Sequence, residues 1–130
     1  PKAMDWKLLN DVDVVLLSIE DIKGHEYFLE SIIENADQVV VTKGEIGAVI
    51  YANGKEHFYP SFPTKEVDAT GAGDVFSTAY LMELEKRRDI ESACIYAHCA
   101  ASFVVEGLGL KRLPSQESLN QRIEKYYKKV

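Results

Sequence analysis

The stretch VDATGAGDVF, residues 67–76, places two glycines, two alanines and two aspartates directly before an apolar helical pattern. A helix start needs only one capping residue, and Asp, Ser, Thr or Asn would serve. Gly71 and Gly73 allow backbone geometry that other residues rarely adopt, and Ala72 adds almost no bulk between them. Successive N–H groups can therefore point into one concavity at the positive end of a helix. The stretch predicts an anion-binding site.

Asp74 immediately follows these glycines, although a fixed carboxylate would repel a bound phosphate. The residue makes chemical sense if it accepts a proton from the group that attacks phosphorus. The alternative interpretation is that Asp74 only caps the helix and that the glycines form a tight turn. A Walker A loop is excluded because Asp74 and Val75 stand where that motif requires Lys and Ser or Thr. The dinucleotide pattern G-x-G-x-x-G does not follow a strand here either.

Length and composition restrict the class of protein. The chain has 130 residues, 46% of them hydrophobic, which fits one globular domain with a hydrophobic core. The formal net charge of −6 argues against a nucleic-acid-binding surface, which would need a basic face. No apolar run approaches the roughly 18 residues of a membrane span, and no signal segment is evident. We expect a cytoplasmic protein with neither a nucleic-acid nor a membrane partner.

The two cysteines, Cys94 and Cys99, are five positions apart in a helical stretch. This spacing suits neither a C-x-x-C redox motif nor a four-ligand zinc site. We therefore expect both to be small core residues in a reducing compartment.

The first third of the sequence predicts a strand–helix–strand unit. An apolar run at 11–18 and a β-branched run at 38–44 have the length of buried strands, and 21–35 shows a helical period between them. Such a crossover joins parallel strands with a right-handed connection.

The rest of the chain predicts a hairpin followed by helices. Asn53-Gly54 separates two extended runs and is a strong signal for a two-residue hairpin turn. The proline-containing stretch 61–64 is a connector. The three expected helices cover 73–86, 89–105 and a segment after Pro114-Ser115. We predict an α/β fold, a three-layer α/β/α arrangement with a mainly parallel sheet and a β-hairpin at one edge.

The motif D-A-T-G-A-G-D-V-F resembles the C-terminal signature D-T-x-G-A-G-D-x-F of the ribokinase-like (PfkB) family of carbohydrate and nucleoside kinases. Ala69 stands where the family usually has Thr. Upstream, TKGEIG at residues 42–47 is similar to the family's T-x-G-x-x-G, a strand-end loop that contacts nucleotide phosphates. By itself TKGEIG is also typical of a plain strand-to-strand turn. The resemblance implies that loops 44–47 and 71–73 lie close together, where α/β sheets bind ligands.

The resemblance implies a phosphotransferase that uses ATP and Mg²⁺. Asp74 would be the base, and the Gly71–Gly73 loop, with the N–H groups of Ala72, Gly73 and Asp74, would stabilise the transferred phosphoryl group. The nucleotide would be bound by Thr42, Gly44, Gly47, Gly71, Gly73 and His98.

Further roles follow from looser matches. His98 falls where relatives contact adenine, although a partly exposed histidine without function fits the sequence as well. The resemblance assigns Asp68 and Thr70 to a monovalent cation such as K⁺. It assigns Asp21, or Glu20 in its place, to the magnesium network, although Ser18 stands where the family has Asn.

The resemblance covers residues 11–114 and corresponds to the C-terminal half of a family member. We therefore interpret 1–130 as the nucleotide-binding and catalytic portion of such a kinase. The acceptor, a hydroxyl of a sugar, polyol or nucleoside, would bind to an N-terminal half or to another chain, and 1–130 alone would be inactive. The alternatives are a non-catalytic nucleotide-binding module, a pyridoxal or hydroxymethylpyrimidine-type kinase, and an interaction domain whose loops only resemble the motif.

Overall fold

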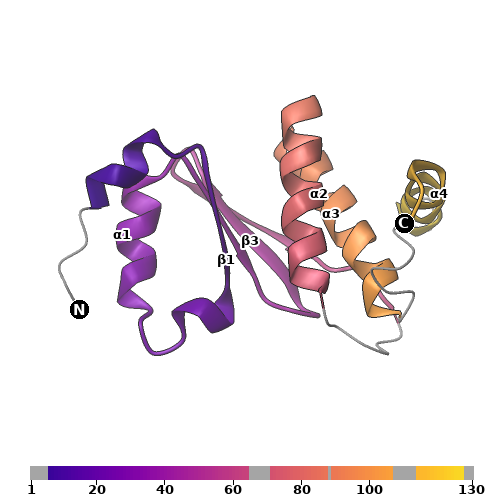
Figure 1. The fold of residues 1–130 in the computed structure, drawn as a ribbon, viewed down its shortest axis with the longest axis horizontal. Helices are drawn as coiled ribbons and strands as arrows, with labels where there is room; N and C mark the ends of the chain where they lie inside the picture. Colours follow the sequence, from indigo (N-terminus) through magenta and orange to yellow (C-terminus); the bar gives the residue numbers. More distant parts are fainter. Residues whose placement is uncertain (1–5, 65–70, 88, 107–113, 128–130) are drawn as a thin grey trace. The chain divides into compact units, whose positions relative to one another are not determined.

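The computed structural model describes residues 6–64, 71–87, 89–106 and 114–127 (Figure 1). The chain divides into two compact units, Pro1–Phe58 and Tyr59–Val130, and each is described by itself below. The predicted cation ligands Asp68 and Thr70 lie outside the described residues.

The first unit contains the predicted strand–helix–strand pattern, preceded by a 3₁₀ helix that the sequence analysis did not predict. The helix expected at 21–35 is divided, because Gly24 adopts a φ of 83° that interrupts a right-handed helix. Before this break a 3₁₀ turn forms, and after it an α-helix. The elements are η1 (Trp6–Asp11), β1 (Val14–Ser18), η2 (Ile19–Ile22), α1 (Tyr27–Asn35), β2 (Gln38–Thr42), β3 (Gly47–Ala52) and β4 (Lys55–Pro60), whose last two residues belong to the second unit.

The four strands form one sheet in the order β1-β2-β3-β4. β1 and β2 are parallel, with Val14 opposite Gln38, which confirms that the predicted crossover joins parallel strands. β2 and β3 are antiparallel, and the turn to β4 is made by Asn53 at φ 55° and Gly54 at φ 70°. The α/β organisation with a hairpin at one edge is thus confirmed. Among the described strands the parallel part is the β1–β2 pair, so the sheet is mixed.

The core of the first unit lies between α1 and the sheet. Ile32 of α1 packs with Val39 and Val41, which are almost completely buried in β2. Partly buried apolar side chains from η1, β1, α1 and β3 surround this cluster. Burial of a β-branched side chain stabilises the fold by about 1.5–3 kcal/mol, which is why the short run 38–42 forms a strand.

The second unit consists of three helices at nearly the predicted bounds: α2 (Ala72–Arg87), α3 (Ile90–Val105) and α4 (Gln116–Tyr127). The small residues Ala93, Ala97 and Ala100 of α3 are buried, and α2 packs closely against α3. From α2, the rings of Phe76 and Tyr80 are stacked and buried. This packing fixes the direction of α2 and therefore of its first turn.

Both cysteines are buried and not disulfide-bonded, as predicted. Burial raises the pKa of the Cys94 thiol and that of the Cys99 thiol to about 12, so neither is ionised at neutral pH. In the parts of the chain that the structure describes, no helix has the length and apolar character needed to cross a membrane.

Candidate phosphate-binding and catalytic site

The first turn of α2 has the geometry expected of an anion site. Gly71 adopts a φ of 84°, and its carbonyl accepts the first helical hydrogen bond from the N–H of Val75 at 3.0 Å. The three preceding N–H groups, those of Ala72, Gly73 and Asp74, have no partner within the helix. They lie at the positive end of the macrodipole of α2, where an anion is stabilised.

The two glycines of this turn have different roles. Gly71 needs its positive φ, but Gly73 lies inside α2 and its φ is not positive, so the expectation that both glycines adopt special geometry is wrong for Gly73. A Cβ added to Gly73 would meet no atom of the surrounding described residues within 4 Å. Glycine in a helix costs up to about 1 kcal/mol relative to alanine, and the described residues around position 73 give no steric reason for a glycine there.

Asp74 is the third residue of α2, and its side chain is exposed. Among the described residues its carboxylate has no hydrogen-bond or ion-pair partner, and Gly71, not Asp74, precedes the helix. These observations do not support the interpretation of Asp74 as a simple cap. The side chain lines an open groove of about 440 Å³ within the second unit. The groove is formed by α2, α3 and α4, through residues that include Thr78, Met82, Tyr96, Ala100 and Leu119.

The TKGEIG motif forms a tight turn between β2 and β3 in the first unit. Lys43 N–H donates to the carbonyl of Gly47 at 2.7 Å, and Gly44 and Gly47 adopt φ values of 57° and 143°. The Thr42 hydroxyl donates to the carbonyl of Leu17 at 3.3 Å, which ties the end of β2 to the end of β1. The expected proximity of this turn to Gly71–Gly73 stays a prediction, because the two loops belong to different units.

Asp21 has a local structural role in the first unit. Its carboxylate accepts a hydrogen bond from the N–H of Ser18 at 2.7 Å, and the Ser18 hydroxyl accepts one from the N–H of Asp21 at 3.3 Å. This capping box forms the start of η2. The described residues contain no group of three His, Cys, Asp or Glu side chains placed to hold a metal ion. The metal role of Asp21, or of Glu20, stays a prediction.

His98 is only 5% exposed and is therefore a core residue of the second unit, not a partly exposed one. Its ring lies 4.7 Å from that of Phe76 and hydrogen-bonds to the backbone of Tyr59. Burial lowers the pKa of His98 from 6.5 to about 4, an effect that the bond to Tyr59 only partly offsets. The ring is neutral at physiological pH, and its Nε2 atom has no hydrogen-bond partner among the described residues. The adenine contact stays a prediction.

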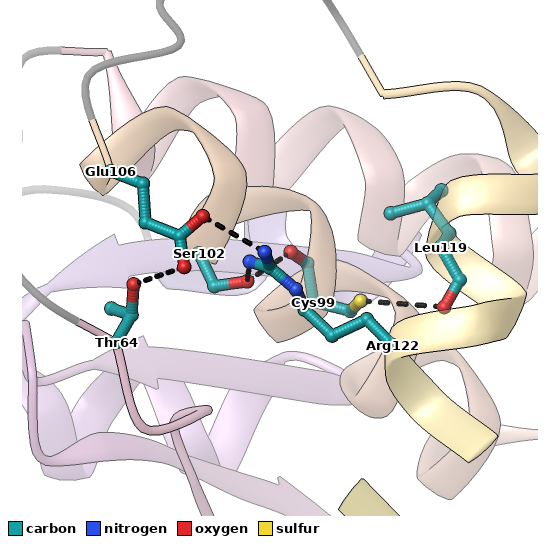
Figure 2. A network of polar contacts seen from close by, with 6 residues as sticks. All are labelled: Thr64, Cys99, Ser102, Glu106, Leu119 and Arg122. Atoms are coloured by element: carbon teal, nitrogen blue, oxygen red, sulfur yellow. Dashed lines mark hydrogen bonds and ion pairs between the residues drawn. The ribbon is translucent and has the colours of Figure 1, made fainter. Parts of the chain in front are cut away.

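A network of polar contacts joins the end of the connector to α3 and α4 (Figure 2). The Glu106 carboxylate accepts hydrogen bonds from the Thr64 hydroxyl at 2.7 Å and from Arg122 at 2.8 Å. Partial burial tends to raise the pKa of Glu106, but the bonds to Arg122 and Thr64 outweigh it, and the net effect lowers the pKa. The sequence analysis missed this network, because its members are far apart in the chain and carry no motif.

Comparison with known proteins identifies the family. The model of the pfkB family carbohydrate kinases matches residues 9–116, which is most of the chain. The chain belongs to this family. The match includes both TKGEIG and the VDATGAGDVF stretch, as the resemblance implied.

Individual relatives are kinases of sugars and nucleosides. A nucleoside kinase of Methanocaldococcus jannaschii is 35% identical over 100 residues, which are 75% of this chain and 33% of the relative. The ribokinase of Bacillus subtilis is 42% identical over 72 residues, which are 55% of this chain and 25% of the relative. The chain therefore spans about a third or less of the length of these relatives.

Solved structures show the same fold. The crystal structure of a Methanocaldococcus jannaschii nucleoside kinase, a ribokinase-family member, aligns with a TM-score of 0.80 and 29% identity over 91% of this chain and 42% of its own. A candidate ribokinase II of E. coli, in complex with ATP and Mg²⁺, aligns with a TM-score of 0.72 and 25% identity, over 96% of this chain and 42% of its own. The predicted ribokinase-like α/β fold is confirmed.

The different roles of the two glycines can be tested by alanine substitution. Gly73→Ala should raise the free energy of unfolding by up to about 1 kcal/mol, because alanine is the better helix former and has room for its Cβ. Gly71→Ala should lower it by about 1–2 kcal/mol, because alanine is strained at positive φ. Chemical denaturation measures both, and destabilisation by Gly73→Ala would contradict the geometry described.

The buried neutral state of His98 predicts a pH dependence of stability. Between pH 6.5 and 4 the unfolded chain binds a proton at His98 that the folded chain does not, so stability should fall as the pH falls through this window. His98→Asn should reduce the loss between pH 7 and 4.5 by about 2–3 kcal/mol. Denaturation at a series of pH values measures this slope. A pH slope in His98→Asn equal to that of the parent would contradict the buried neutral state of His98.

Proposed function

We propose that this chain is the nucleotide-binding and catalytic portion of an ATP-dependent kinase that transfers the γ-phosphate to a hydroxyl of a sugar, polyol or nucleoside. The observation that carries the proposal is the first turn of α2. There, the three consecutive residues Ala72, Gly73 and Asp74 present N–H groups without helical partners. Gly73 is a glycine for which the surrounding described residues give no steric reason, and the Asp74 carboxylate is exposed. Membership of the pfkB family supports the same conclusion.

In this proposal Asp74 accepts the proton of the attacking hydroxyl. The carboxylate is exposed and has no partner among the described residues, so it is available to an acceptor. As the hydroxyl oxygen bonds to phosphorus, negative charge spreads over the equatorial phosphoryl oxygens. The N–H groups of Ala72, Gly73 and Asp74 would donate hydrogen bonds to these oxygens, and Gly73 would let the phosphoryl group approach the backbone closely.

The remaining nucleotide contacts are assigned to the residues of the TKGEIG turn and to His98. Gly44 and Gly47 would present backbone N–H groups to the phosphates beside Thr42. The Nε2 atom of His98, which has no hydrogen-bond partner among the described residues, would accept a hydrogen bond from the adenine amino group. Asp21 or Glu20 would hold Mg²⁺, which would neutralise negative charge on the nucleotide phosphates, and Asp68 and Thr70 would hold a monovalent cation.

The acceptor pocket belongs, in this proposal, to a portion of the kinase outside residues 1–130. The chain aligns with 42% of the length of the solved nucleoside kinase. This partial coverage supports the proposal that a portion outside residues 1–130 binds the acceptor. We expect the chain alone to bind nucleotide and to phosphorylate no sugar. A non-catalytic nucleotide-binding module would also bind ATP, and the exposed Asp74 side chain favours the kinase over it.

Nucleotide binding by this chain is the first test. Mg-ATP should bind weakly, at up to millimolar dissociation constants, in titration calorimetry. Gly73→Ala should weaken this binding by about tenfold or more, because its methyl group occupies the space of the phosphoryl oxygens. No binding by the parent chain up to millimolar ATP would contradict the proposal. If a stable Gly73→Ala variant bound Mg-ATP with the affinity of the parent, Gly73 would not be part of the phosphate-binding site.

The role of Asp74 is tested in an active form that contains the acceptor-binding portion. Asp74→Asn keeps the shape of the side chain but removes the proton acceptor, so kcat should fall by about 10²–10⁴-fold. The affinity for ATP should stay within about threefold. Steady-state kinetics measures both, with Glu85→Gln as a control at an exposed carboxylate of α2. A kcat within about threefold of the parent would show that Asp74 is not the base.

A further inference from the structure

The two edges of the four-stranded sheet differ in character. β4 forms one edge, and its first three residues, Lys55, Glu56 and His57, are exposed. Charged side chains at a sheet edge oppose pairing with a further strand. β1, indigo in Figure 1, forms the other edge, and its sequence VVLLS contains no charged residue and no proline. This edge therefore lacks the charges and prolines that usually protect an edge strand.

The residues of β1 are suited to the interior of a sheet. A strand of a parallel pair is normally buried on both faces and has a continuous apolar sequence. β1 has such a sequence and is parallel to β2, yet each of its five residues is partly exposed. In β2, by contrast, Val39, Val40 and Val41 are almost completely buried. The sequence of β1 thus fits a more interior position than the described strands give it.

Two hydrogen bonds show which way the backbone of β1 faces. The Leu17 carbonyl accepts from the Thr42 hydroxyl at 3.3 Å, so the backbone groups of Leu17 point toward β2. The Ser18 N–H donates instead to the Asp21 carboxylate at 2.7 Å, so it points away from β2. The backbone groups of successive residues in a strand face alternate sides.

This alternation assigns the remaining residues of β1. Val15 faces β2 with Leu17, and Val14 and Leu16 face outward. The outward N–H and C=O groups of Val14 and Leu16 have no strand partner among the described residues, because the sheet ends at β1. They form a short row of donors and acceptors that another strand can pair with.

We propose that the outer edge of β1 is the docking edge for an apolar strand of the acceptor-binding portion. That strand extends the sheet through main-chain hydrogen bonds to Val14 and Leu16. The inference rests on the proposed function, which assigns the acceptor to a portion outside residues 1–130. The solved nucleoside kinase has the same fold at a TM-score of 0.80, and the chain aligns with only 42% of it, so the larger part of that fold lies outside the match.

Charge argues against a second copy of this chain as the occupant. Asp11 and Asp13 precede β1, and Glu20 and Asp21 follow it. Two copies related by a two-fold axis would pair their β1 strands antiparallel, which brings the first two carboxylates of one copy next to the last two of the other. Like charges opposite each other destabilise a strand pair. The Ser18 N–H, already bonded to Asp21, could not donate to the second copy either.

Proline substitution of two adjacent valines tests the edge. Val14→Pro removes an N–H that faces outward, whereas Val15→Pro, the matched control, removes one that faces β2. In the chain 1–130, Val14→Pro should nearly keep the parent midpoint of chemical denaturation, and Val15→Pro should lower it. In a longer form that contains the acceptor-binding portion, Val14→Pro should lower the midpoint as well, because it removes a hydrogen bond to the added strand.

Hydrogen exchange measured by NMR provides a second readout at the same edge. In the chain 1–130 the Leu16 amide should exchange at least about tenfold faster than the Leu17 amide, because a free edge opens more easily than a paired ladder. In the longer form, exchange of the Leu16 amide should slow by about tenfold or more.

The outcomes that would overturn the proposal can be told apart. Equal exchange of the Leu16 amide in both forms would show that no strand covers this edge. Slow exchange in the chain 1–130 that becomes faster on dilution would make a second copy the occupant. Equal loss of stability in Val14→Pro and Val15→Pro of the chain 1–130 would contradict the assigned N–H directions. If the longer form phosphorylates no sugar, polyol or nucleoside, the proposed function fails, and the exchange comparison still decides whether its remaining portion pairs with β1.

Discussion

The packing of α2 on α3 is the constraint on which the candidate site depends. Phe76 and Tyr80 project from α2 into the core, and the small buried residues of α3 let the two helices approach closely. Because Phe76 and Tyr80 lie within the first three turns of α2, their burial also fixes where its first N–H groups point. The anion site is therefore built on a rigid element.

Two groups in this part of the fold are retained at a cost in stability. Gly73 weakens a helix that alanine would strengthen, and the buried Nε2 atom of His98 has no hydrogen-bond partner among the described residues. The packing of the described residues explains neither feature, and the two residues lie on α2 and α3, which pack against each other. Residues that lower the stability of the fold in this way are common at binding and catalytic sites. They agree with the proposal that a nucleotide completes the site.

The polar network joins α4 to the end of α3 and to the connector after β4. Arg122 and Thr64 both donate hydrogen bonds to the Glu106 carboxylate. The Phe103 ring covers the Arg122 guanidinium. The three helices of the second unit are therefore held together by the packing of α2 on α3 and by these polar contacts between α3 and α4.

Local patterns in the sequence predicted the strands, the hairpin, the motifs and the helices of the second unit, but not η1 or the division of the helix expected at 21–35. The Asn53-Gly54 turn, the β-branched run of β2 and the glycines before α2 each act over a few residues, so their structures follow from propensity and turn chemistry. The tertiary structure alone decided which glycine needs a positive φ, how deeply His98 is buried and what Glu106 contacts. Thr64 and Glu106 are 42 positions apart, and Glu106 and Arg122 are 16 apart. No local pattern encodes such pairs, because they meet only after the helices have packed.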